Sequence, residues 1–152
     1  MKTRGFTLLE VLLVVTILAI AFGFFTLYSQ NTQIRTDLNA QTAVLVSHLR
    51  LAQSNASSGN TTGYNAIHLD AANSNYTAFI GATFDAQSAT NTVVQLPTTI
   101  SFQNILLNGG GTDIVFNGPE GETTNYGTFE IFLSSTSQSH IITISEIGTV
   151  NY

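Results

Sequence analysis

An apolar stretch near the N-terminus constrains this chain more than any other feature. Residues 11–28 are apolar at all but three positions, which are Thr16, Gly23 and Thr26. No charged residue falls between Glu10 and Arg35. Because a helix of about 20 predominantly apolar residues can cross a bilayer, the stretch predicts a membrane-spanning helix.

The residues before this stretch predict its orientation. Lys2 and Arg4 are basic, and basic residues stay on the cytoplasmic side of a membrane helix, so we expect the N-terminus inside and the rest outside. The stretch is longer than the apolar core of about 7–15 residues in a secretory signal. The nearest small-x-small triplet, residues 19–21, lies inside the stretch rather than after it. We therefore expect a retained single-pass helix in the cytoplasmic membrane.

Glu10, at the edge of the stretch, has two interpretations. A carboxylate there costs about 1 kcal/mol or more, and up to about 3 kcal/mol at the bilayer centre. Either the side chain is hydrated in the headgroup layer and has no further role, or it meets a positive partner that a lone helix does not supply.

Residues 5–10 read Gly-Phe-Thr-Leu-Leu-Glu. Followed by a long apolar helix, this run resembles the start of type IV prepilins and of the pseudopilins of type II secretion. The resemblance implies that a prepilin peptidase cleaves between Gly5 and Phe6 and N-methylates Phe6. It also implies that Glu10 pairs with the Phe6 amine of a neighbouring subunit during assembly. The implied partners are other pilin or pseudopilin subunits, the peptidase and the inner-membrane assembly platform.

The helix is expected to continue past the membrane as an amphipathic segment. Apolar residues recur at spacings of three, four or seven: Ile34, Leu38, Leu45, Leu49 and Ala52. The Asn/Ser/Gly-rich run at 55–60 predicts the end of the helix. A helix from residue 6 to about 55 is roughly 75 Å long, too long for a compact domain alone. The expected divisions are a leader (1–5), a transmembrane or filament-core helix (6–29), its amphipathic continuation (30–58) and a β-rich head (59–152).

Short β-rich runs separated by Asn, Gly and Ser turns fill the head. The expected strands are 64–69, 76–80, 92–96, 99–107, 113–116, 126–133 and 140–147. The triple glycine at 109–111 lacks the Lys-Ser/Thr of a phosphate loop, and we expect it to form a hairpin turn. The predicted fold class is α+β: a long N-terminal helix packed against a C-terminal antiparallel sheet.

Parts of the head resemble the minor pseudopilins of the GspH/FimT type. The segments that carry the resemblance are 49–56 at the helix end, 96–102 and 114–118 in the middle, and 142–148 at the close. After the final glycine this family usually continues with arginine, and its DNA-uptake members with further basic residues. Here Gly148 is followed by Thr-Val-Asn-Tyr. A DNA-receptor role is therefore not implied.

The charge distribution also disfavours nucleic acid as a partner. From residue 51 onward there is no Lys or Arg, but seven carboxylates: Asp70, Asp85, Asp113, Glu120, Glu122, Glu130 and Glu146. A surface of this kind cannot neutralise phosphates. The helix also lacks the proline that interrupts many major pilins, a departure that leaves major-subunit status open.

Few residues point to catalysis or to metal binding. The chain has no cysteine, which excludes thiolate chemistry and disulfides. The histidines, His48, His68 and His140, have no metal-ligand spacing. We expect no enzyme activity, no cofactor and no metal. Two alternatives stay open: calcium at 70–75 or 117–122, and glycosylation at Asn55, Asn60 or Asn75.

The sequence thus predicts a structural subunit of a type IV pilus or a type II secretion pseudopilus, cleaved after Gly5. We expect a minor subunit; the alternatives are a major pilin, or a surface adhesin that the pilin helix presents. Before assembly it would span the cytoplasmic membrane, and afterwards it would belong to a periplasmic or cell-surface filament.

Overall fold

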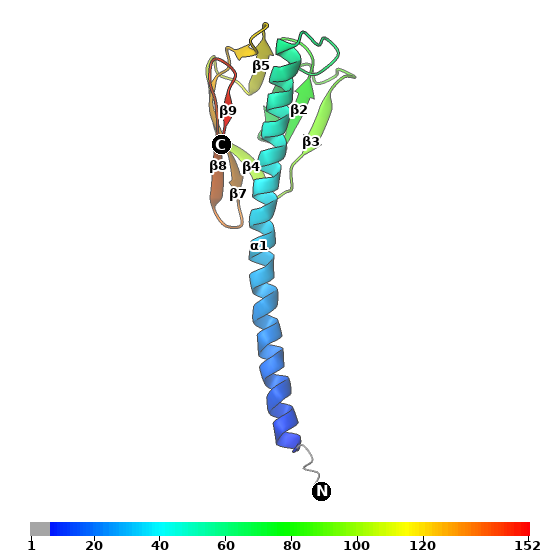
Figure 1. Ribbon diagram of the computed structural model, residues 1–152, viewed down its shortest axis with the longest axis vertical. Helices are drawn as coiled ribbons and strands as arrows, with labels where there is room; N and C mark the ends of the chain where they lie inside the picture. The colour runs from blue at the N-terminus through cyan, green and yellow to red at the C-terminus, as the bar shows by residue number, and fades with distance from the viewer. Residues whose placement is uncertain (1–6) are drawn as a thin grey trace. The chain divides into compact units, whose positions relative to one another are not determined.

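A computed structural model describes residues 7–152, with the side chains of all of these except 25–35. In that part of the chain, one long helix, α1 (Leu8–Ser57), precedes nine strands (Figure 1). The chain divides into two units, Met1–Asp37 and Leu38–Tyr152. The expected leader (1–5) and Phe6, where the helix was predicted to begin, lie outside the described residues.

The helix ends where the Asn/Ser/Gly run predicted. Gly59 adopts a positive φ of 67°, a conformation that glycine reaches without steric cost. Its amide donates to the Ala56 carbonyl at 3.2 Å, and the Asn60 amide donates to the Asn55 carbonyl at 2.9 Å. These bonds satisfy carbonyls that have no partner inside the helix, so the chain leaves α1 and enters the head.

The predicted fold class, α+β with a long N-terminal helix and antiparallel strands after it, is confirmed, and the strands form two sheets. The first has the order β3-β2-β1-β5-β6 and the second the order β4-β7-β8-β9. Their bounds are β1 (Ala66–Asp70), β2 (Asn75–Phe79), β3 (Thr92–Gln95), β4 (Ile100–Leu107), β5 (Asp113–Asn117), β6 (Glu122–Thr123), β7 (Gly127–Leu133), β8 (Gln138–Ile144) and β9 (Val150–Asn151). All seven predicted strands are present, while the two-residue strands β6 and β9 were not predicted.

The triple glycine at 109–111 lies in one of the three connections at which the chain passes from one sheet to the other. All three residues have positive φ, with values of 84°, 70° and 95°. They connect β4 of the second sheet to β5 of the first. The predicted hairpin turn is therefore wrong, because this glycine run redirects the chain to the other sheet instead of pairing the flanking strands.

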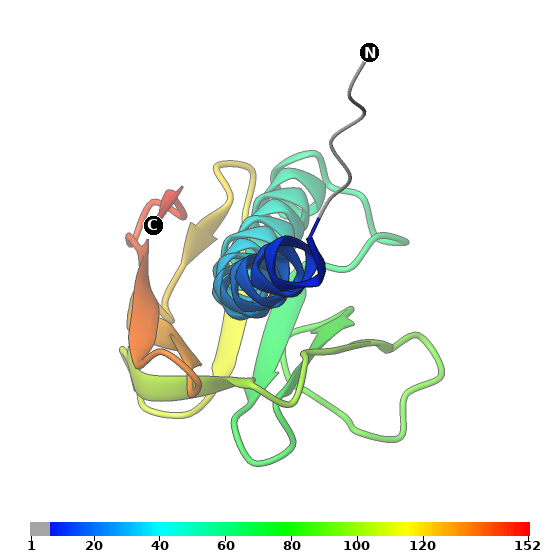
Figure 2. The same ribbon diagram turned by 90° about the horizontal axis from the view of Figure 1, so that it is seen from below.

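The C-terminal part of α1 buries one stripe of side chains against the head. The buried residues are Leu38, Thr42, Leu45, Val46, Leu49 and Ala52. Seen from below, strands of both sheets curve around one side of this helix (Figure 2). The predicted stripe is confirmed from residue 38 on, and the side chain of Ile34 lies outside the described ones. Thr42 was missed because it is polar, but its hydroxyl donates to the Leu38 carbonyl at 2.8 Å, which makes its burial inexpensive.

The sheets meet the helix through alternating residues. Phe129, Ile131 and Leu133 of β7 are fully buried, as their spacing predicted. From β2, the Tyr76 hydroxyl lies 2.9 Å from Nδ1 of His48 on α1. Burial, with a smaller effect of nearby Tyr64, raises the pKa of Tyr76 to about 12. The Tyr76 hydroxyl is therefore neutral at any physiological pH.

Truncating the helix stripe should destabilise the head. We expect Leu49→Ala to lower the free energy of unfolding by about 2–5 kcal/mol, because it leaves a cavity at a fully buried site. Leu51→Ala is the matched control, since Leu51 lies on the same turn of helix but is 48% exposed. Denaturant unfolding of the two variants in detergent measures the difference. Equal losses would show that the stripe is not the core.

Candidate functional site

The first turn of α1 is closed by a capping arrangement that includes Glu10. The Glu10 amide donates to the Thr7 hydroxyl at 3.3 Å and to the Thr7 carbonyl at 3.1 Å. Threonine at the cap and glutamate three residues later form the sequence pattern of a capping box. A carboxylate in this turn also opposes the positive end of the helix dipole. This local role of Glu10 was missed, although the Thr-x-x-Glu spacing would have indicated it.

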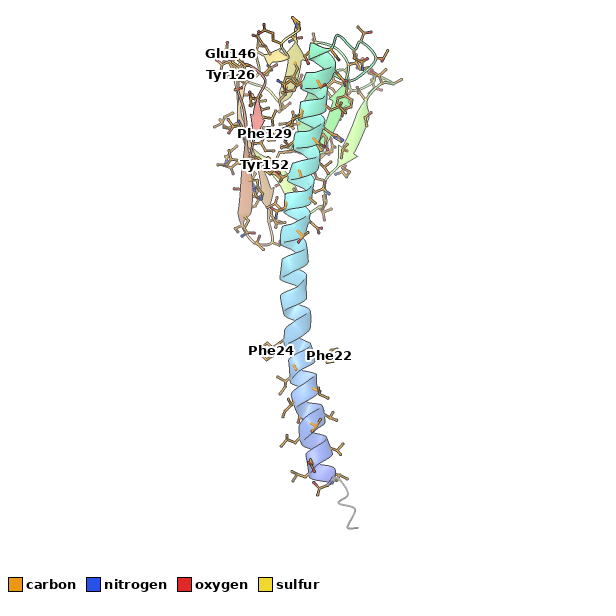
Figure 3. All side chains as sticks on the ribbon, viewed as in Figure 1. Phe22, Phe24, Tyr126, Phe129, Glu146 and Tyr152 are labelled. Carbon is orange, nitrogen blue, oxygen red and sulfur yellow. The ribbon has the colours of Figure 1, made fainter. Side chains whose placement is uncertain are left out.

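Beyond the cap, α1 carries apolar side chains on every face. Over residues 8–24, the large apolar side chains more than 40% exposed are Leu8, Leu9, Val11, Leu12, Leu13, Val14, Val15, Ile17, Leu18, Ile20, Phe22 and Phe24. Figure 3 shows Phe22 and Phe24 projecting from the helix, at exposures of 72% and 71%. A helix that is apolar all round is stable only when a protein or lipid environment surrounds it. This surface is therefore a candidate assembly surface.

Glu10 is the one charged side chain among residues 7–24. The hydroxyl of Thr16, a polar group inside the apolar run, is satisfied by the helix itself, since it donates to the carbonyls of Leu12 and Leu13 at 2.8 Å. Glu10 has no such partner for its charge: within the described residues, the one ion pair is His68–Asp113. Desolvation of this helix therefore leaves a carboxylate that needs a cation from elsewhere.

The other two predicted site residues, Gly5 and Phe6, lie outside the described residues. Over the described part of the chain, no helix combines the length and the apolarity that crossing a membrane requires.

A second site is a tight junction between the end of α1 and two turns of the head. The Gln53 amide donates to the carbonyls of Gly121, at 3.4 Å, and Ile147, at 3.3 Å. Gly148 has a φ of 82°, and a Cβ built on it would lie 2.0 Å from the Gly121 oxygen and 2.5 Å from Nε2 of Gln53. Only glycine fits this close approach.

The junction unites two segments that resemble the GspH/FimT type. Gln53 belongs to the helix-end segment 49–56, and Gly148 ends the closing segment 142–148. One turn earlier on the helix, the Arg50 guanidinium donates to the Val150 carbonyl in β9 at 3.1 Å. These contacts join the helix-end segment directly to the closing segment, about 100 residues later in the sequence.

Each histidine has a different partner. His68 donates from Nδ1 to Asp113 at 2.6 Å, and its ring stacks on Phe84 with centroids 3.9 Å apart. His140 donates from Nε2 to Asn39 at 2.8 Å, while His48 contacts Tyr76. In the described part of the chain, no group of three or more His, Asp or Glu side chains could hold a metal ion.

The calcium candidate at 70–75 is an Asx turn. The Asp70 carboxylate accepts the Asn73 amide at 3.0 Å and the Asn73 side chain at 2.7 Å. The bond from the Asn73 side chain is the main reason that the pKa of Asp70 lies below its ordinary value. Its oxygens are thus used within the turn. The candidate at 117–122 covers the turn between β5 and β6, with positive φ at Gly118 and Gly121.

The three possible glycosylation sites differ in access. Asn55 is engaged, because its amide donates to the Tyr64 carbonyl at 2.9 Å. Asn75 begins β2, and the threonine of its motif, Thr77, is buried. Asn60 is exposed, and its side chain accepts bonds from the Thr62 amide and hydroxyl.

Comparison with known families finds two matches. The model described as "Prokaryotic N-terminal methylation motif" matches residues 1–26, which include Gly5, Phe6 and Glu10. The model described as "Type II transport protein GspH" matches residues 41–148, from the buried helix stripe to the glycine of the junction. No match was found among curated proteins or among solved structures.

The junction predicts a large difference between two glycine substitutions. Gly148→Ala should lower the free energy of unfolding by about 3 kcal/mol or more, because left-handed backbone strain adds to a steric clash. Gly110→Ala, at a φ of 70° with nothing within 4 Å of its added Cβ, carries the strain alone and should lose about 1–2 kcal/mol. Thermal and denaturant unfolding would compare the two variants. Similar losses of unfolding free energy would show that close packing at Gly148 contributes little.

Proposed function

Because this chain belongs to the family of the type II transport protein GspH, we propose that it is a minor structural subunit of a type II secretion pseudopilus or a type IV pilus. The family and the N-terminal methylation motif make it a pilin- or pseudopilin-type subunit. The minor role is supported by the extent of the GspH match and by the absence of proline from the helix.

The observation that carries the proposal is the N-terminal part of α1. It exposes apolar side chains on all faces and holds a single carboxylate, Glu10, in its first turn. Such a helix needs an apolar environment that also offers one positive charge. A bundle of identical or related helices, each starting with a free amine, supplies both.

Processing creates that positive charge. Cleavage of the amide between Gly5 and Phe6 removes Lys2 and Arg4 and leaves the Phe6 amine as the new N-terminus. N-methylation exchanges one N–H for a methyl group, so the amine keeps its positive charge while it loses some hydration. The proposed pair is this ammonium of one subunit and the Glu10 carboxylate of a neighbour. Each is costly alone in an apolar bundle, and the two offset each other when paired.

Before assembly, the apolar segment is proposed to lie across the cytoplasmic membrane with the head outside. Lys2 and Arg4 support the N-terminus-in orientation. The apolar sequence continues from the described side chains to Tyr28, which gives about the length that a bilayer requires. The prepilin peptidase and an assembly platform in that membrane would be its first partners.

The role is proposed to be structural and not enzymatic. The separate partners of the three histidines support this, since a nucleophile and its base must be in contact. Nucleic acid is not a favoured partner, because residues 51–152 carry seven carboxylates and no Lys or Arg to pair with phosphates.

Substitution of Glu10 should separate processing from assembly. We expect Glu10→Ala to be cleaved normally but to fall at least about tenfold in the filament fraction, because the desolvated amine loses its partner. Gly5→Leu is the contrasting variant, which should remain uncleaved in the membrane. Immunoblots of membrane and sheared-filament fractions read both. Full incorporation of Glu10→Ala into the filament would show that Glu10 acts only as a helix cap. Normal processing of Gly5→Leu would contradict the hypothesis that the chain is a prepilin.

Subunit abundance should distinguish a minor from a major role. We expect this chain to be a trace component when sheared filaments are quantified by mass spectrometry. The digest needs a protease that cuts at carboxylates, since trypsin has no site after Arg50. Dominance of this chain in the filament would make it a major pilin.

A further inference from the structure

The outer face of the second sheet has an unusual combination of side chains. Pairing places Glu130 of β7 between Gln103 of β4 and Ile141 of β8. One neighbouring row adds Leu106, Thr128 and Thr143 to the same side, and the other adds Ser101, Phe132 and Ser139. These nine residues define what we call the outer face. It contains one charge, at its centre.

This face is open to solvent. Leu106 is 69% exposed and Ile141 is 55% exposed, while Glu130 and Phe132 are partly exposed. The opposite side of β7 is buried, through Phe129 and Ile131. In Figures 1 and 2, β7 and β8 lie at the margin of the head, and no described element is drawn beyond them. A largely uncharged face with exposed Leu and Ile is typical of a protein contact surface.

We propose that the outer face docks a different subunit, one that contributes an Arg or Lys side chain to Glu130. The inference rests on the proposed function and names the chemistry of the partner. When apolar surfaces close over this face, the Glu130 carboxylate loses water. It then needs a cation from the partner, since no described residue of its own chain forms an ion pair with it.

A second copy of this head does not fit the face. Residues 51–152 contain no Lys or Arg, so another head brings carboxylates and no permanent positive charge. After processing, the chain keeps two basic side chains and the Phe6 amine. The Arg50 guanidinium is held by the Val150 carbonyl, while Arg35 and the Phe6 amine precede the head in the sequence. Charge complementarity therefore acts against the association of two heads and favours a partner that brings its own basic side chain.

A photoreactive residue at position 141 in the full-length chain, expressed in its native cells, tests the contact. Irradiation should give an adduct with a different protein, identified by mass spectrometry. The matched control is a probe at Val93, which is 61% exposed on β3 of the other sheet and should give no such adduct. An adduct between two copies of this chain, or none at position 141, would overturn the proposal.

Charge substitutions then test the role of Glu130. We expect Glu130→Lys to reduce the position-141 adduct about tenfold or more, and the isosteric Glu130→Gln to reduce it less. Glu120→Lys, an equal charge change in the exposed turn before β6, is the control and should leave the adduct unchanged. Thermal unfolding of each variant separates lost binding from lost folding. An adduct that persists in a folded Glu130→Lys protein would refute the ion pair.

The same samples separate this inference from the proposed function. The chain could be processed and reach the filament fraction but form no position-141 adduct. In that case the docking proposed for the outer face is wrong and the proposed function stands. If the chain is absent from that fraction, the proposed function fails.

Discussion

Burial of one helical stripe is the interaction on which the head depends. Among the described strands, no strand of one sheet pairs with a strand of the other. For example, β4 follows β3 in sequence but belongs to the second sheet. Leu45, Leu49 and Ala52 supply fully buried surface between them. Side-chain bonds from α1 reach both sheets, to β2 through His48 and to β8 through Asn39. Without the helix, each sheet would expose its apolar side, so the helix is part of the core and not only a stalk.

Much of this organisation was predictable, because it follows from local periodicity. The alternation of Phe129, Ile131 and Leu133 identified a half-buried strand, and the spacing of Leu38, Leu45 and Leu49 identified the buried stripe. The predictions that were wrong or missing concern features that depend on contacts between residues distant in sequence. The division into two sheets depends on which strands pair, and the triple glycine lies in only one of the three connections between the sheets. Strands β6 and β9 are too short for any period to appear.

The candidate site was likewise predictable only in part. Glu10 was identified because its charge contradicts its apolar surroundings, which is visible in sequence alone. The tight contact of Gly148 with Gly121 and Gln53 was not predictable, because a glycine in sequence does not say which backbone approaches it. The family resemblance marked both Gln53 and Gly148, but the reason for the pattern is three-dimensional: the closing turn must pass within van der Waals distance of the helix end.

Glu10 and Glu130 present one physical problem at two places in the chain. Each is a lone carboxylate within a surface that is otherwise apolar or uncharged, and each costs free energy if that surface is buried without a cation. In the proposed function, the cation for Glu10 is the amine that processing creates on every related subunit, so that contact is common to the whole filament. The cation for Glu130 cannot come from another copy of the head. The first carboxylate thus favours polymerisation in general, whereas the second restricts which neighbour the head accepts. Such a division of roles is what a subunit present in few copies requires.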